Sequence, residues 1–277
     1  MNIILAHGVL GFRERFRIEY FNGVAEHLQK LPAKVLLTEV SPSGGIPTRG
    51  EALRSQILGG FNNGTLDPGE KAHIIAHSMG GLDSRYLLSP ANEKTTSQND
   101  ISLRIASLTT ISTPHRGSPI ADFLAFQPAT ESAKLHTVHA ILNRLSGLED
   151  AVRELLDHFG LSVDALKDLT TQATLAFNQR YPDHPRIRYL SVAGAGRDGL
   201  MPTAVVLFPC YKYIRAVKAE ASDALVPVPS AQWGDFDSNT WHCDHAEEIG
   251  HDLDHPFQKP HFDYLARYDE IVKRALA

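Results

Sequence analysis

Short apolar runs alternate with helical patterns along the first half of the chain. The segments between these runs are long enough for crossover helices, so the pattern predicts an α/β fold with a mostly parallel central sheet and helices on both of its faces. An amphipathic helix marked by Phe262, Leu265, Ile271 and Val272 is expected to close the chain. The predicted strands are Ile3 to Ala6, Val35 to Val40, His73 to Ala76, Ile105 to Ile111 and, later in the chain, Ile187 to Ala193.

Helical spacing replaces the strand pattern between about residues 118 and 178. We therefore predict a single domain over residues 1–277 with a helical insertion at about 118–178. Spacing alone fits both helices that cover one edge of the sheet and a cap or lid over a pocket. The three apolar stripes are Leu135, Val138, Leu142 and Leu145; Val152, Leu155, Leu156 and Phe159; and Leu166, Leu169, Ala173 and Phe177.

Composition and charge narrow the class of partner. The chain has 277 residues, of which 43% are hydrophobic, so it can bury a substantial core. Its net charge is −5, with 27 basic and 32 acidic side chains distributed throughout, which gives no footprint for nucleic acid or an anionic membrane. No apolar run approaches the roughly 18 residues of a transmembrane segment. A small-molecule or neutral substrate therefore fits this composition better than nucleic acid or an anionic membrane does.

The beginning of the chain and its cysteines bear on the compartment. The first strand-like run follows Met1 so closely that a signal peptide has no room, so the chain as it stands is expected to be cytoplasmic, and secreted if a leader has been removed. Cys210 and Cys243 are the two cysteines. They allow one disulfide, but without an export signal two reduced thiols are favoured.

One serine stands where a nucleophile would be expected. The stretch Ala76-His77-Ser78-Met79-Gly80 follows an apolar run and precedes a helical pattern, and small residues lie two positions before and after the serine. A sharp strand-to-helix turn requires such residues and exposes the hydroxyl. The pattern is weak alone and gains weight from this context. The Met79 amide would then face an oxyanion, and a glycine turn after the first strand would bring in the Val9 amide.

The base and the acid have several candidates among the residues themselves. A serine nucleophile on this kind of turn is followed along the chain by an acid and then a histidine. Asp198 and Asp223 begin nearly identical segments. Asp198 directly follows a predicted strand and Asp223 comes after an insertion, so topology alone favours Asp198. The C-terminal part of the chain offers five histidines, which are His242, His245, His251, His255 and His261.

Taken together, these motifs resemble the bacterial triacylglycerol lipases of the Pseudomonas and Proteus type, within the α/β-hydrolase superfamily. The matching segments run in the same order over nearly the whole chain, and each is weak alone. They are His7 to Phe12, Ala76 to Gly81, Ser112 to Ser118, Phe177-Asn178 with Tyr181-Pro182, Asp223 to Val226, and Asp244-His245 with the acidic residues that follow.

The resemblance implies a choice of acid and base. In these lipases a small, serine-containing segment ending in glycine follows the acid, as Pro229 to Gly234 follows Asp223 here, and nothing comparable follows Asp198. The histidine lies shortly beyond that segment and precedes acidic residues, as His245 does; His242 and His251 are the alternatives. The implied triad is therefore Ser78, Asp223 and His245, with an oxyanion hole from the Val9 and Met79 amides.

The resemblance also raises a structural Ca²⁺ site, although the reaction requires no cofactor. Related lipases use an aspartate two residues after the histidine and another well before the acid. Glu247 takes the first of these positions, and no aspartate aligns with the second, so a calcium site is doubtful. The nearby histidines and aspartates could instead bind a transition metal, but a solvated His/Asp-rich loop is the favoured interpretation.

We therefore predict a serine carboxylester hydrolase, a lipase or esterase, that cleaves acyl esters of lipid-like substrates through an acyl-enzyme. The expected partner is an ester or lipid small molecule, with transient contact with a lipid interface compatible with this activity. The alternatives are another acyl hydrolase (a thioesterase, lactonase or phospholipase), an amidase or acyltransferase, and a non-catalytic protein of the same fold that binds a hydrophobic ligand. A non-catalytic relative normally has a broken triad, whereas all three members are present here.

Overall fold

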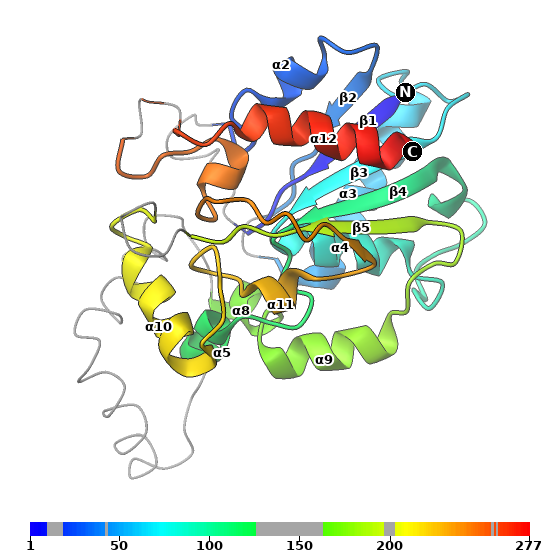
Figure 1. The fold of residues 1–277 in the computed structure, drawn as a ribbon. Helices are drawn as coiled ribbons and strands as arrows, with labels where there is room; N and C mark the ends of the chain where they lie inside the picture. Colours follow the sequence, from blue (N-terminus) through cyan, green and yellow to red (C-terminus); the bar gives the residue numbers. More distant parts are fainter. Residues whose placement is uncertain (10–18, 42–43, 126–162, 197–202, 256–257, 259) are drawn as a thin grey trace.

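A parallel sheet of six strands lies at the centre of the fold (Figure 1). The computed structural model describes residues 1–277 apart from 10–18, 42–43, 126–162, 197–202, 256–257 and 259. Within this part the strand order is β2-β1-β3-β4-β5-β6, and every neighbouring pair is parallel. The strands are β1 (Asn2–Ala6), β2 (Lys34–Leu37), β3 (Ala72–His77), β4 (Ile105–Ile111), β5 (Arg188–Val192) and β6 (Asp235–Phe236).

Helices connect the strands and cover both faces of the sheet, as the sequence predicts. The connections include two short 3₁₀ helices, η1 (Ser102–Arg104) and η2 (Glu247–Ile249). The α-helices are α2 (Val24–Leu28), α3 (Ile46–Asn62), α4 (Met79–Leu88), α5 (Pro119–Ala125), α8 (Val163–Lys167), α9 (Thr171–Arg180), α10 (Phe208–Lys218), α11 (Val228–Ala231) and α12 (Tyr264–Leu276).

Side chains of β1 alternate between two hydrophobic cores. Ile4 belongs to the core that contains Leu53 of α3 and Leu82 of α4. Ile3 belongs to the opposite core, which contains Tyr268 of α12. All five residues of β1 are buried, which is expected for a parallel strand covered on both faces. In Figure 1, α12 crosses one face of the sheet while α3 and α4 lie behind it.

The predicted strands are confirmed, with small shifts at their ends. The run Ile105 to Ile111 forms β4 with the predicted bounds, whereas the second strand ends at Leu37 rather than Val40. Beyond Leu37 the Thr38 amide still donates to the Leu5 carbonyl, whereas the Val40 amide donates to the His7 ring instead of to a neighbouring strand. β6 was not predicted, because two residues give no periodic pattern.

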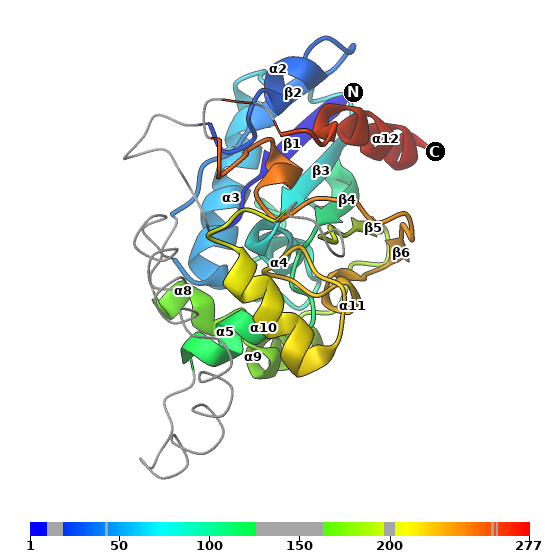
Figure 2. The ribbon, with the colours of Figure 1, turned by 60° about the vertical axis from the view of Figure 1, so that its left-hand side comes forward.

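The described ends of the predicted insertion are helical. α5 precedes residues 126–162, and α8 and α9 follow them. In the third predicted stripe, Leu166 lies in α8, Ala173 and Phe177 lie in α9, and Leu169 lies in the turn between these helices. α9 begins after Thr170, whose side chain accepts from the Ala173 amide as an N-cap. The first two stripes lie outside the described residues. Figure 2 shows α10 beside α5, and Ile120, Cys210 and Ile214 form a small core between these two helices.

Two further expectations concern the membrane and the cysteines. In the part of the chain that the structure describes, no helix is long and apolar enough to cross a membrane. Cys210 and Cys243 are both buried and unpaired, as favoured from the sequence. Burial raises the pKa of the Cys210 thiol to about 12, so this cysteine is kept as a neutral thiol in the core.

Two glycines provide a matched test of the packing between β1 and α4. A Cβ at Gly80 would lie 2.4 Å from the Ala6 carbonyl oxygen and 2.7 Å from that of His7, both of which are backbone atoms. A Cβ at Gly59, inside α3, would meet nothing within 4 Å. We expect Gly80→Ala to lower the free energy of unfolding in urea by about 2 kcal/mol or more, because the backbone must move. Gly59→Ala should be neutral or stabilising by up to about 1 kcal/mol. Equal effects of the two substitutions would contradict this packing.

Candidate active site

Ser78 lies in a sharp turn between β3 and α4, as the sequence predicts. Its backbone has φ 56° and ψ −133°, a conformation that is rare for a residue with a side chain. The turn is held by the Ser78 amide, which donates to the Ile111 carbonyl at 2.9 Å, and by the Thr113 hydroxyl, which donates to the Ser78 carbonyl at 2.7 Å. Such strain is characteristic of a nucleophile elbow, where it brings the hydroxyl to the carboxyl end of the sheet.

The turn after β1 packs directly against Ser78. A Cβ at Gly8 would lie 2.6 Å from Ser78 Cβ and 3.1 Å from its Oγ, so only glycine fits at this position. Val9 follows in the chain and is buried. Met79 is the first residue of α4, and its amide is one of the N-terminal amides that have no acceptor within the helix. The two predicted oxyanion donors thus belong to the two turns that meet at Ser78.

The turn at His7 and Gly8 is fixed by side chains from three directions. The Val40 amide donates to His7 Nε2 at 2.9 Å, which assigns the ring proton to Nδ1, where it is donated to the Gly8 carbonyl. Arg49 donates to the His7 carbonyl at 2.9 Å, and the Gly8 amide donates to the Tyr20 hydroxyl at 3.0 Å. Burial, helped by the Arg49 charge, lowers the pKa of His7 from 6.5 to about 4.

His245 and Asp223 form a buried hydrogen-bonded pair. His245 Nδ1 lies 2.7 Å from Asp223 Oδ2, and the His245 amide donates to the Asp223 carbonyl at 3.0 Å. The other carboxylate oxygen accepts from the amides of Leu225 and Val226. Ala224, with φ +84°, makes the tight turn that brings those amides back to the carboxylate. A proton on Nδ1 leaves Nε2 as an acceptor, which is the tautomer that a general base needs.

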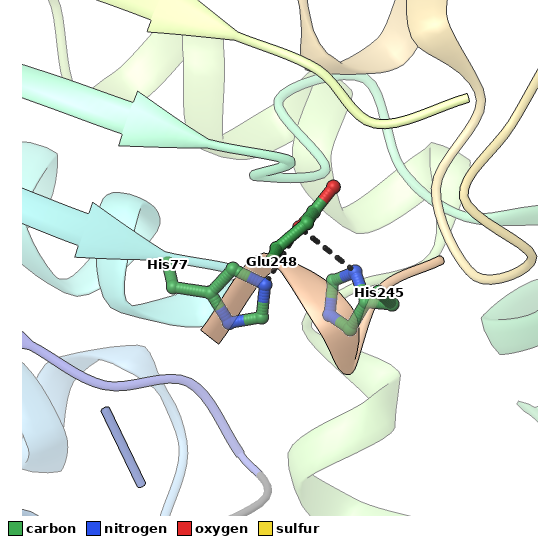
Figure 3. A group of neighbouring side chains, drawn as sticks. All are labelled: His77, His245 and Glu248. Carbon is green, nitrogen blue, oxygen red and sulfur yellow. Dashed lines mark hydrogen bonds and ion pairs between the residues drawn. The ribbon is translucent and has the colours of Figure 1, made fainter. Parts of the chain in front are cut away.

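The pair is joined to the elbow through His77 and Glu248. The rings of His77 and His245 lie 4.4 Å apart, and Figure 3 shows them on either side of the Glu248 carboxyl group. Glu248 Oε2 lies 2.8 Å from His77 Nε2 and 3.8 Å from His245 Nδ1. The structure therefore brings three parts together at the carboxyl end of the sheet: the turn that contains Ser78, the Asp223 carboxylate and the His245 ring.

The other predicted acid, Asp198, falls outside the described residues, and the other candidate bases have different surroundings from His245. His242 is exposed, and His251 Nε2 donates to the carbonyls of Glu19 and Tyr20. His255 is an exposed partner of Asp252. Among the described histidines of this region, His245 is the one whose ring bonds to a predicted catalytic acid.

The predicted metal ligand Glu247 lines a cavity of about 250 Å³ together with other acidic residues and histidines. The carboxylates there already bond to the protein: both Asp244 oxygens accept backbone amides, and Asp252 bonds to the backbone and ring of His255. In the described part of the chain, three metal-ligating atoms converge only at His77, His245 and Glu248, outside this cavity. The calcium site at Glu247 stays a prediction, and no step of the chemistry is assigned to a metal.

Sequence reasoning missed the buried residues that surround the pair. Glu248 was noted only as an acidic residue after His245, and Tyr20 was not singled out at all. Burial, with the nearby Asp223 charge, raises the pKa of Glu248 well above its usual range, and burial lowers the pKa of His77. The three-residue spacing between His245 and Glu248, which η2 converts into proximity, was the one available signal.

Asp83 and Arg85, in the helix after the elbow, have structural roles. Arg49 pairs with Asp83 at 2.8 Å, and Arg85 pairs with Asp183 at 3.2 Å while its guanidinium lies 3.6 Å from the Trp233 ring centroid. Both side chains are therefore occupied in ion pairs away from the Asp223–His245 pair.

Comparisons with known proteins agree with this fold and arrangement. Residues 19–144 match the family model described as "Putative serine esterase (DUF676)". The chain is 30% identical to the triacylglycerol lipase of Pseudomonas fragi over 243 residues, covering 83% of this chain and 72% of that protein. It is 27% identical to the triacylglycerol lipase of Vibrio cholerae over 262 residues, covering 89% of this chain and 78% of that protein. The crystal structure of Staphylococcus hyicus lipase superposes with a TM-score of 0.68 at 17% identity, covering 99% of this chain and 94% of that one, and shows the same fold.

Fold and comparisons together define an ester hydrolase of the α/β-hydrolase type. The chain belongs to the triacylglycerol lipase family. Its function is that of a lipase or esterase, acting on ester or lipid substrates.

The neutral state of His7 predicts a specific pH dependence of stability. In the unfolded chain His7 takes up a proton near pH 6.5, whereas in the folded protein it does so near pH 4. The stabilisation that comes from keeping His7 neutral is therefore fully present above pH 6.5. As the pH falls from 6.5 toward 4, this contribution to the free energy of unfolding decreases by at most about 1.4 kcal/mol per pH unit. Urea unfolding of the wild type and His7→Gln at several pH values should show their difference shrinking over this interval. Parallel curves would rule out this assignment.

Proposed function

We propose that Ser78, His245 and Asp223 hydrolyse acyl esters of lipid-like substrates through an acyl-enzyme intermediate. The 2.7 Å bond between His245 and Asp223, beside the strained turn at Ser78, is the observation that carries the proposal. Membership of the triacylglycerol lipase family supports the same chemistry.

In the first half of the reaction, Ser78 Oγ attacks the ester carbonyl carbon while its proton passes to His245 Nε2. The carbonyl oxygen becomes an oxyanion and accepts hydrogen bonds from the amides of Val9 and Met79. When the intermediate collapses, the carbon–oxygen bond to the alcohol breaks and His245 donates its proton to that alcohol. The acyl group remains on Ser78.

In the second half, water attacks the acyl carbon and gives its proton to His245. The second oxyanion collapses, the bond to Ser78 Oγ breaks, and His245 returns the proton to the serine. Asp223 holds the imidazole in one orientation throughout and stabilises its charged form. The reaction needs no metal or cofactor.

The lipid-like substrate is supported by the relatives. Proteins of Vibrio cholerae and Pseudomonas fragi that this chain resembles are named triacylglycerol lipases, and a triacylglycerol is a lipid that contains acyl esters. We further propose that the protein contacts a lipid interface transiently when its substrate is aggregated.

Two substitutions test the nucleophile and the base. We expect Ser78→Ala to abolish labelling by a fluorophosphonate, and both Ser78→Ala and His245→Ala to lower kcat/KM for p-nitrophenyl esters by about 10³- to 10⁶-fold, because members of a triad act as a unit. His242→Ala, an exposed imidazole in the same segment, should retain normal rates. If His245→Ala kept near-normal rates, the base would lie elsewhere; if the intact protein were neither labelled nor active, a non-catalytic binding function would replace this proposal.

The twin acidic segments provide the test of the acid. Asp223→Asn should lower kcat by about 10³- to 10⁴-fold, because an amide no longer selects the Nδ1-protonated imidazole. Asp198→Asn, made in the nearly identical segment, should be close to wild type in steady-state ester hydrolysis. A loss confined to Asp198→Asn would show that the acid had been assigned to the wrong segment.

A further inference from the structure

A continuous chain of buried hydrogen bonds runs from the turn after β1 to η2. The Gly8 amide donates to the Tyr20 hydroxyl at 3.0 Å, and the same hydroxyl lies 2.7 Å from His77 Nδ1. His77 Nε2 lies 2.8 Å from Glu248 Oε2. The Ser112 hydroxyl donates to the other carboxyl oxygen of Glu248 at 2.5 Å. Groups that lie more than 200 residues apart in the sequence are thus connected by an unbroken series of hydrogen bonds.

The chain of bonds has almost no access to solvent. His77 and Glu248 are completely buried, and Tyr20 is 7% exposed. Burial lowers the pKa of His77, so its ring is neutral and one nitrogen donates while the other accepts. The direction of donation on the Glu248 side of the ring therefore fixes the direction on the Tyr20 side. A bond lost at one end leaves a buried polar group unsatisfied, which proteins avoid.

Each link lies next to a group of the proposed reaction. Gly8 precedes the oxyanion donor Val9 and packs against Ser78. His77 immediately precedes Ser78 in the chain. Glu248 Oε2 lies 3.8 Å from His245 Nδ1 (Figure 3). Glu248 and Tyr20 bond to different nitrogens of the His77 ring. The chain of bonds therefore begins at the oxyanion turn, passes through the residue before the nucleophile and ends at a carboxyl group that lies beside the base.

We propose that Tyr20, His77 and Glu248 are positioning residues that hold the oxyanion turn at Gly8 and Val9 in place against Ser78 and His245. This inference rests on the proposed function and adds three residues that do not touch the substrate. Tyr20 is the residue on which the turn depends, because its hydroxyl accepts the Gly8 amide. Without that hydroxyl the turn keeps the bonds that Arg49 and Val40 make to His7 and the bond from the His7 ring to the Gly8 carbonyl, but the Gly8 amide loses its acceptor.

The expected consequence is a loss of transition-state stabilisation with little loss of substrate binding. A displacement of about 1 Å in an oxyanion donor costs on the order of 10²-fold in rate. A substrate carbonyl carries no full charge in the ground state and depends on this donor much less. A purely structural role would instead lower thermal stability without separating kcat from KM.

The test compares Tyr20→Phe with Tyr264→Phe. Tyr264 is also a buried tyrosine, and its hydroxyl donates to the Asn22 carbonyl at 2.8 Å in a partly buried hydrogen bond, so its loss removes one hydrogen bond away from the oxyanion turn. For p-nitrophenyl butyrate we expect Tyr20→Phe to lower kcat by about 10- to 100-fold with KM within about 2-fold. The inhibition constant of an alkyl trifluoromethyl ketone, whose adduct carries the oxyanion, should rise by the same factor. Tyr264→Phe should leave all three quantities unchanged.

A second variant tests whether the residues act as one chain. Glu248→Gln keeps the shape of the side chain and changes its donors and acceptors. The double variant with Tyr20→Phe should lose no more activity than the more damaged single variant, because a broken chain cannot be broken again. Factors that multiply would show independent roles and overturn the proposal, as would a Tyr20→Phe protein with the kcat and ketone affinity of Tyr264→Phe. In that case the fluorophosphonate would still label the wild type and not Ser78→Ala, so the proposed function would be retained while the positioning role of Tyr20 would be rejected.

Discussion

Ser78 adopts a left-handed backbone conformation between β3 and α4, and the geometry of the site depends on it. A non-glycine residue in such a conformation costs about 1–3 kcal/mol and persists only where its surroundings enforce it. Here the surroundings are specific. Gly80 lets α4 begin against the carbonyls of β1, Gly8 leaves room for the serine side chain, and Thr113 binds the Ser78 carbonyl. The strained turn places the Ser78 hydroxyl at the carboxyl end of the sheet, where the other functional groups converge.

Strained backbone conformations and buried polar groups occur together at the carboxyl end of the sheet. Ser112 and Ala224 also have positive φ, and each adjoins a group of the site: the Ser112 hydroxyl bonds to Glu248, and Ala224 turns the chain so that amides reach Asp223. Uncompensated polar groups in this volume would be expensive to bury. Nearly every one has a partner, so the same hydrogen bonds that offset the cost of burial also fix the orientation of the reacting side chains.

Much of the fold could be predicted because its strands are buried on both faces. The segments that became β1, β3 and β4 contain short apolar runs and are almost entirely buried, and the small residues around Ser78 predicted the elbow. The two-residue strand β6 carries no period and could not be found. Asp223 was separated from Asp198 only through a family resemblance, since the two segments have the same local pattern. Tyr20, His77 and Glu248 meet because strand register and η2 bring distant segments together, which no local pattern encodes.

The central claim is that one strained serine is the nucleophile and that the amides of Val9 and Met79 receive the oxyanion. The most direct measurement is a crystal structure of the protein after reaction with a fluorophosphonate. The account predicts phosphorus bonded to Ser78 Oγ, with the phosphoryl oxygen about 2.7–3.1 Å from both amide nitrogens. Phosphorus on another side chain, or a phosphoryl oxygen directed away from the two turns, would contradict it.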